Sequence, residues 1–197
     1  MAFKVRVSGA KACFARPEFR VDRISYDVIT PFAARAILDA IYWRPQMRWR
    51  IDTIQVLNPI IFAEESASEP GSERISPRTI ALADVDYVIE AHFDLIGPET
   101  SSGNAASHTK MFLKRVRAGQ YFRKPFLGLP EFPATIALIE KTDAVPRSHL
   151  PAQGTRDIGW IAHDIDSNAP SGMRFFRALM EDGSIQVPPH DSCLLGT

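Results

Sequence analysis

One stretch of the sequence gathers the residue types that can bind and transform a phosphodiester. Residues 104–124 contain six Lys or Arg side chains and one histidine, His108, but no Asp or Glu. Positive side chains neutralise phosphates, and a histidine can accept or donate a proton near neutral pH. The stretch therefore indicates a polyanion-binding surface with an acid–base group at its entrance. A solvated basic helix face is the simpler alternative.

Charge is segregated along the chain although its formal net charge is zero. Residues 1–50 carry ten Lys or Arg against four acids, and residues 63–99 carry nine acids against two Arg. Residues 100–130 carry six basic residues and no acid. A neutral molecule with this pattern can still present a positive face to a polyanion.

The remaining reactive residues give no metal or cofactor signature. The five histidines show neither HxH nor HExxH spacing, and no phosphate-binding glycine motif is present. The segment HDID at 163–166 has metal-like composition, but alternate residues of a strand face opposite ways, so we expect no metal there. Cys13 and Cys193 form no CxxC, which fits the reducing cytoplasm, and no apolar run is long enough to span a membrane.

Local patterns predict the elements that must position these residues. FKVRV at 3–7 alternates as a half-buried strand, and Thr30-Pro31 opens a helix that Pro45 ends near Trp43. The segment at 48–60 predicts a strand whose phase slips between Ile51 and Ile54, which indicates either a bulge or burial of both faces. DYVIEAHFDLI at 86–96 predicts another strand, after a long polar loop over 63–77.

A second helix is expected over 107–118, with Ser107 as its N-cap and Gly119 at its end. Such a helix would direct its free N–H groups and positive dipole end toward a phosphate near His108. TIALIE at 135–140 predicts the next strand.

The order of these elements is β-α-β-β-α-β, which predicts an α+β fold of the ferredoxin-like type that RNA-recognition domains use. We expect this domain to span residues 1–141. Residues 142–197 are expected to form a linker and a small antiparallel β-hairpin unit, with Asp182-Gly183 at a turn.

Long segments of the chain resemble one family, the CRISPR-associated Cas5 proteins of subtype I-C, also called Cas5d. The resemblance lies in the motif IYWRP and in residues 12–60, 84–95, 111–134, 157–166 and 173–188. It implies a metal-independent endoribonuclease that cleaves CRISPR precursor RNA in the repeat hairpin, by attack of a 2′-OH that leaves a 2′,3′-cyclic phosphate. It also implies that the protein stays bound to the 5′ handle of the guide RNA in the Cascade complex.

The resemblance also assigns roles to residues. The family's catalytic tyrosine falls on Tyr42 and its histidine on His108, while Ser107 stands where the family has a lysine. Lys110, one helical turn further on, can take over that positive charge. The alternative function is a subunit that binds and caps the 5′ handle without cutting. Tyr42, Trp43 and His108 also have purely structural interpretations, as core aromatics and a helix-end histidine.

The basic residues near these positions are the expected RNA contacts. We assign to this group Arg16, Arg20, Arg44, Lys114, Arg115, Arg117, Arg123 and Lys124. The implied partners are precursor and mature CRISPR RNA and the backbone and large subunits of Cascade. Nonspecific duplex DNA remains an open alternative partner.

Overall fold

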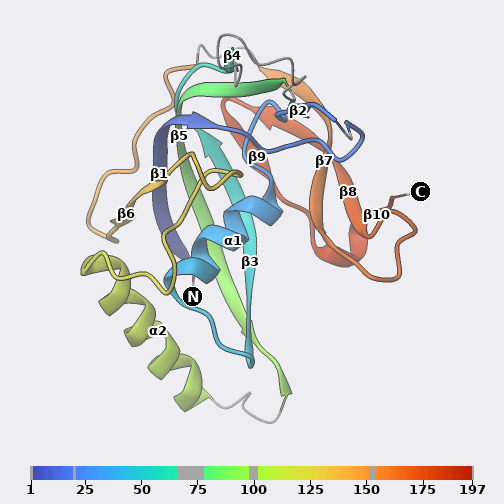
Figure 1. The fold of residues 1–197 in the computed structure, drawn as a ribbon. Coiled ribbons are helices and arrows are strands. Elements are labelled where there is room, and N and C mark those ends of the chain that lie inside the picture. The colour runs from blue at the N-terminus through green and yellow to red at the C-terminus, as the bar shows by residue number, and fades with distance from the viewer. Residues whose placement is uncertain (1, 20, 66–77, 98–101, 151–153, 197) are drawn as a thin grey trace.

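A computed structural model describes the chain except for residues 1, 20, 66–77, 98–101, 151–153 and 197. A long antiparallel sheet forms its centre (Figure 1). The first half contains β1 (Phe3–Ala12), β2 (Arg23–Ile24), α1 (Pro31–Ile41), β3 (Met47–Val56), β4 (Ile61–Glu65) and β5 (Thr79–Leu95). The second half contains α2 (Ser102–Arg117), β6 (Thr135–Ile139), β7 (Thr155–Ile165), β8 (Met173–Glu181), β9 (Ser184–Gln186) and β10 (Leu194–Leu195).

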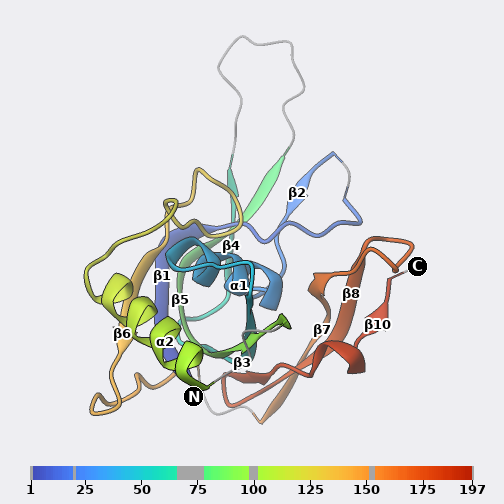
Figure 2. The same ribbon diagram turned by 90° about the horizontal axis from the view of Figure 1, so that it is seen from below.

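The strands of the sheet follow the order β10-β8-β9-β3-β5-β1-β6. The four strands β6, β1, β5 and β3 pair antiparallel throughout. α2 and β6 lie at one end of the molecule, and β7, β8 and β10 lie at the other (Figures 1 and 2). The predicted α+β class is therefore confirmed.

Local sequence signals set the ends of α1 and the irregularity of β3. The Thr30 hydroxyl accepts a hydrogen bond from the Ala33 N–H at 3.2 Å, and Pro31 occupies the first turn. The helix ends before Tyr42, whose backbone is extended. The register of β3 against β5 shifts between Ile51 and Thr53, so the predicted bulge is confirmed.

Several predicted boundaries are wrong, and the strand predicted over 86–96 in fact begins at Thr79, as β5. α2 begins at Ser102, so Ser107 lies inside the helix and is not its N-cap. Asn104, Ala105 and Ala106 contain no helix breaker, and alanine is the best helix former, so nothing stops the helix from starting earlier. The predicted loop over 63–77 is wrong at its start, because Ala63–Glu65 belongs to β4, which pairs with β5. The rest of that loop lies outside the described residues.

The core fills the space between the sheet and the two helices. Its largest fully buried side chains include Trp49, Ile54, Leu82, Ile89 and Phe112. Both cysteines are free and buried, and burial raises the pKa of the Cys13 thiol to about 11. Within the described residues no helix is long and apolar enough to cross a membrane.

Candidate active site

The end of α1 and the second turn of α2 bring Tyr42 and His108 into contact. Tyr42 Oη and His108 Nδ1 lie 2.8 Å apart, a hydrogen bond between residues that are distant in the sequence. The Tyr42 side chain is buried at 3% exposure, whereas His108 is half-buried. The ring nitrogen that does not contact Tyr42 is Nε2. The pair therefore combines a shielded phenol with an imidazole whose partly exposed ring can meet a ligand.

The backbone around Tyr42 is fixed from two sides. The indole N–H of Trp49 on β3 donates to the Tyr42 carbonyl oxygen at 3.0 Å. The Arg115 guanidinium on α2 donates to the Ile41 carbonyl oxygen at 3.2 Å. These bonds satisfy carbonyl groups that the end of a helix leaves unpaired, and they connect α1 to the sheet and to α2.

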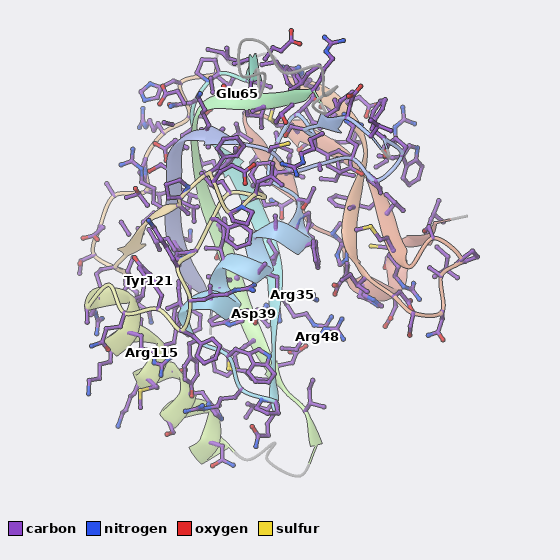
Figure 3. All side chains as sticks on the ribbon, in the orientation of Figure 1. Arg35, Asp39, Arg48, Glu65, Arg115 and Tyr121 are labelled. Carbon is purple, nitrogen blue, oxygen red and sulfur yellow. The ribbon has the colours of Figure 1, made fainter. Side chains whose placement is uncertain are left out.

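Two guanidinium groups contact the Tyr42 ring. The Cζ atom of Arg44 lies 5.5 Å from the ring centroid, and the Cζ atom of Arg115 lies 5.4 Å from it. Both distances are within the range of a cation–π interaction. Figure 3 labels Arg115 on α2. The pair thus lies beside two positive charges, which is the environment that a phosphate group requires.

Packing also holds the imidazole of His108. Its ring lies 6.3 Å from the ring of Phe93 on β5, in an edge-to-face arrangement. Phe93 contacts Phe3 and Trp49 in the same aromatic cluster. His108 is therefore oriented by the core and by its hydrogen bond to the Tyr42 hydroxyl.

The basic residues of α2 divide between two faces of the helix. His108 and Arg115 are seven residues apart and face α1, as their contacts with Tyr42 show. Lys110, Lys114 and Arg117 instead line a shared surface hollow with Leu113 and Ala118. Ser107 is exposed. The predicted anion site at a helix N-terminus beside His108 is wrong, because His108 lies beyond the first turn and the dipole effect fades there.

Other predicted RNA contacts differ in their charge pairing. Among the described residues Arg44, Lys114, Arg115, Arg123 and Lys124 form no ion pair with a carboxylate. Arg117 is paired with Glu140 at 2.7 Å. Arg16 is half-buried and paired with Glu18 and Asp27, and Arg20 lies outside the described residues. The first group is free to bind phosphate, and the paired residues would first have to release a carboxylate.

Sequence reasoning missed three features of this site. It identified neither the Trp49 hydrogen bond nor the contacts of Arg44 and Arg115 with the Tyr42 ring. It also interpreted Trp43 as a core aromatic, whereas this side chain is 51% exposed. The extended backbone at Tyr42 explains the exposure, since successive side chains of an extended segment point to opposite sides. Only the position of Trp43 next to a helix-ending Pro45 could have indicated it.

The HDID segment is part of a different arrangement. Asp164 accepts hydrogen bonds from Arg35 and Arg48, and Asp166 accepts one from Arg174. His163 Nε2 bonds to the Pro188 carbonyl oxygen at 2.9 Å. The described residues contain no group of three or more His, Cys, Asp or Glu that could hold a metal ion.

Comparison with known proteins connects this geometry to a family. The family profile described as CRISPR-associated protein (Cas_Cas5), of the Cas5d type, matches residues 2–188. A protein of Mannheimia succiniciproducens named CRISPR pre-crRNA endoribonuclease Cas5d is 40% identical over 217 residues, covering 96% of each chain. A protein of the same name from Thermus thermophilus is 37% identical over 142 residues, which cover 66% of this chain and 61% of that protein.

Solved structures agree in fold over the whole chain. A crystal structure described as a CRISPR-associated protein has a TM-score of 0.79 and 26% identity, covering 100% of this chain and 97% of that chain. A functionally uncharacterized protein of Streptococcus mutans has a TM-score of 0.75 and 25% identity with the same coverage. Since the family profile spans nearly the entire sequence, the chain belongs to the Cas5d family of CRISPR-associated proteins.

Proposed function

We propose that this protein is an endoribonuclease that cleaves CRISPR precursor RNA within the repeat hairpin. Its 40%-identical relative is named a pre-crRNA endoribonuclease. The observation that carries the proposal is the 2.8 Å contact between Tyr42 Oη and His108 Nδ1 beside the guanidinium groups of Arg44 and Arg115. This arrangement offers a proton-transfer group and positive charge at one point on the surface, which are the requirements of phosphodiester cleavage.

The reaction needs no metal and no water. The ribose 2′-OH loses its proton to a base, its oxygen forms a bond to the adjacent phosphorus, and the bond from phosphorus to the 5′ oxygen breaks. The leaving oxygen takes up a proton and becomes a 5′-OH, while the phosphate becomes a 2′,3′-cyclic ester. The transition state carries extra negative charge, which Arg44 and Arg115 are positioned to stabilise.

The hydrogen bond within the pair determines which proton can move. If His108 donates its Nδ1–H to Tyr42 Oη, the Nε2 lone pair is free and the imidazole can act as a base. If Tyr42 instead donates to Nδ1, His108 carries its proton on Nε2, and it can give that proton away as the phenol proton moves to Nδ1. The hydrogen bond permits both tautomers and couples the phenol proton to the imidazole, so Tyr42→Phe would remove this coupling and slow the reaction.

A second candidate function is a subunit that binds the 5′ handle without cutting it. The exposed, uncharged Ser107 favours it, since the resembling family has a lysine at this position. We assign Lys110 as the substitute charge, although it lines the hollow with Lys114 and Arg117 rather than contacting Tyr42. In both functions the partners are the guide RNA and the backbone and large Cascade subunits. The free, buried cysteines support a cytoplasmic location, and nonspecific duplex DNA binding stays an expectation.

The strand arrangement supports the predicted ferredoxin-like topology. α1 connects β1 to β3, α2 connects β5 to β6, and the four strands stand in the order β6-β1-β5-β3. With intervening β2 and β4 set aside, this is the order expected of a βαββαβ domain. The predicted boundary after residue 141 stays a proposal. β9 pairs with β3, so the C-terminal strands belong to the same sheet as the first domain.

The test is single-turnover cleavage of the cognate repeat hairpin in EDTA. We expect the wild type to cut and His108→Ala to cut about 10²–10⁴-fold more slowly, the usual contribution of a general acid or base. A 2′-deoxy substitution at the cut site should abolish cleavage. Hairpin affinity should remain in His108→Ala, since the cations are unchanged.

Ser107→Lys separates the two functions. If the wild type is silent and this substitution creates cleavage that His108→Ala removes, the natural protein is a handle-binding subunit. If His108→Ala cuts as fast as the wild type, the assignment of the pair is wrong. Cleavage that needs a divalent ion and survives the deoxy substitution would refute the mechanism.

A further inference from the structure

Three exposed aromatic side chains gather at the end of α1. Phe122 is 80% exposed, Trp43 is 51% exposed and Tyr121 is 38% exposed. The Phe122 N–H donates to the Ala40 carbonyl oxygen at 2.7 Å, and the Arg123 N–H approaches the same oxygen at 3.4 Å. These bonds fix the segment after α2 against the last turn of α1. The backbone of Phe122 therefore lies beside the last turn of α1, and Trp43 follows that turn directly.

This concentration of exposed aromatic rings is unusual for the molecule. Six Phe, Tyr or Trp side chains are among the exposed large hydrophobic residues of the described chain, and three of them belong to this group. The other three, Phe19, Phe62 and Trp160, come from separate segments. Aromatic rings are normally buried, and a cluster of exposed ones marks a surface that a ligand covers.

The charges around the group identify the chemistry of that ligand. In the described part of the chain Arg44, Arg115 and Lys124 have no carboxylate partner within ion-pair distance, and no acid occurs over 100–130. The guanidinium of Arg123 lies 5.7 Å from the centroid of the Phe126 ring. Aromatic rings interleaved with free cations are typical of surfaces that bind single-stranded nucleic acid, with the rings stacking on bases and the cations on phosphates.

We propose that Trp43 and Phe122 stack on unpaired bases next to the cleaved phosphate and so set the position of the RNA strand. This inference rests on the proposed function and adds positioning residues to it. Trp43 directly follows Tyr42 in an extended backbone, so its ring leaves the core on the side opposite to the Tyr42 ring. A base held on Trp43 or Phe122 would fix the neighbouring phosphate relative to Arg44 and His108.

Stacking has a signature that charge does not have. Every base offers a ring face, so the contact tolerates sequence changes but requires a base to be present. It also releases no counterions, so its loss should weaken binding without changing the salt dependence. Both properties distinguish a stacking residue from a cation and from a residue that only supports the fold.

The experiment is a double-mutant cycle between protein and RNA. Repeat hairpins with unpaired flanks are prepared intact and with a single abasic nucleotide at each flanking position in turn. Their Kd values are measured by fluorescence anisotropy, and their cleavage by single-turnover kinetics, with the wild type, Trp43→Ala and Phe122→Ala. The matched control is Trp160→Ala, because Trp160 is 50% exposed and lies on β7 at the opposite end of the molecule.

We expect each of the two variants to weaken binding of the intact hairpin by about 5- to 150-fold, the measured range for one stacked base. The salt slope should stay at the wild-type value. At one flanking position the abasic RNA should bind the variant and the wild type equally, because the partner base is already absent. Trp160→Ala should bind every RNA like the wild type.

The proposal is overturned if Trp43→Ala and Phe122→Ala bind the intact hairpin like the wild type, or if Trp160→Ala weakens binding equally. It is also overturned if no abasic position removes the effect of either variant. Both side chains are exposed, so folding of the variants is not at risk. A wild type that never cuts but shows the coupling in Kd would refute the nuclease proposal and leave the stacking proposal intact.

Discussion

Two regions of this molecule contain the same types of side chain, histidine and arginine, but differ in whether the arginines are paired with carboxylates. At one end His108 bonds to Tyr42, whose ring lies beside Arg44 and Arg115, and these two arginines form no ion pair with a carboxylate of the described chain. Near the C-terminal strands His163 lies in a cavity of about 340 Å³ whose lining includes Arg35 and Asp164. There the arginines are already occupied, because Arg35 and Arg48 both donate to Asp164 (Figure 3 labels both).

Charge pairing, rather than residue type, separates a binding site from a structural network. An unpaired guanidinium on the surface retains its capacity for phosphate, whereas a guanidinium bonded to a buried carboxylate stabilises the fold. The HDID motif has the composition of a metal site, but its two carboxylates are bonded to arginines. The following experiments test whether this pairing separates the two regions.

The largest expected effect is on stability at Asp164. Asp164 is 5% exposed, and its carboxylate accepts hydrogen bonds from two guanidinium groups. Asp164→Ala should lower the free energy of unfolding by about 3 kcal/mol, the lower end for breaking a buried pair, since both arginines are partly exposed. The measurement is urea unfolding, with Asp157→Ala as a control because the exposed Asp157–Arg177 pair should contribute little to stability.

One outcome would contradict the contrast between the two regions. If Asp164→Ala is as stable as the wild type but loses hairpin affinity, the C-terminal region takes part in RNA binding and its arginines are not reserved for the fold.

An intermediate effect is expected on the face of α2 that contains Lys110 and Lys114. Neither lysine has an ion-pair partner in the described chain, so Lys110→Ala/Lys114→Ala should lower the slope of log K against log salt by about 1.4 if each contacts one phosphate of a single strand. Affinity at 0.1 M salt should fall about 25-fold. Arg117→Ala should have a smaller effect per residue, because its guanidinium is already bonded to Glu140. Equal effects for Arg117 and the lysines would show that pairing does not decide function here.

The smallest effect concerns pH and His163. Burial lowers the pKa of this imidazole below its usual value, although the bond to the Pro188 carbonyl oxygen opposes the shift. Because the unfolded chain binds a proton at a higher pH than the folded chain, stability should fall as pH falls below about 6.5. Between pH 7.5 and 5.5 the loss is at most about 1.4 kcal/mol for one proton.

Urea unfolding at the two pH values measures this contribution. The wild type should lose more stability than His163→Gln, which carries no titrating ring. Equal losses in the wild type and in His163→Gln would show that the burial of His163 does not set this pH dependence.

Sequence reasoning succeeded where the determining interactions are local. The Thr30 cap, the bulge after Ile51 and the hairpin turn at Asp182 and Gly183 each depend on a few neighbouring residues. Asp182 and Gly183 both adopt positive φ, as a two-residue hairpin requires. The resemblance to a family, rather than local pattern, selected Tyr42 and His108.

Sequence reasoning failed where the structure of a segment depends on a partner that is distant in the sequence. The strand β4 carries acidic residues and becomes a strand only by pairing with β5, a contact that no local pattern contains. The start of α2 was misplaced because Ser107 has a side chain that favours an N-cap, and no local signal shows that the helix already begins at Ser102. The contacts of Arg44 and Arg115 with Tyr42 likewise depend on how α1 and α2 pack.

The separation of Tyr42 and His108 in the chain has a consequence for biosynthesis. The two partners of the 2.8 Å hydrogen bond are 66 positions apart in the sequence, and Phe93, whose ring packs against His108, lies between them in the sequence. A nascent chain of which only α1 and β3 have emerged from the ribosome presents Tyr42 but not His108. Since chains emerge from the N-terminus onward, the protein becomes able to act on RNA only after α2 has left the ribosome and docked against α1.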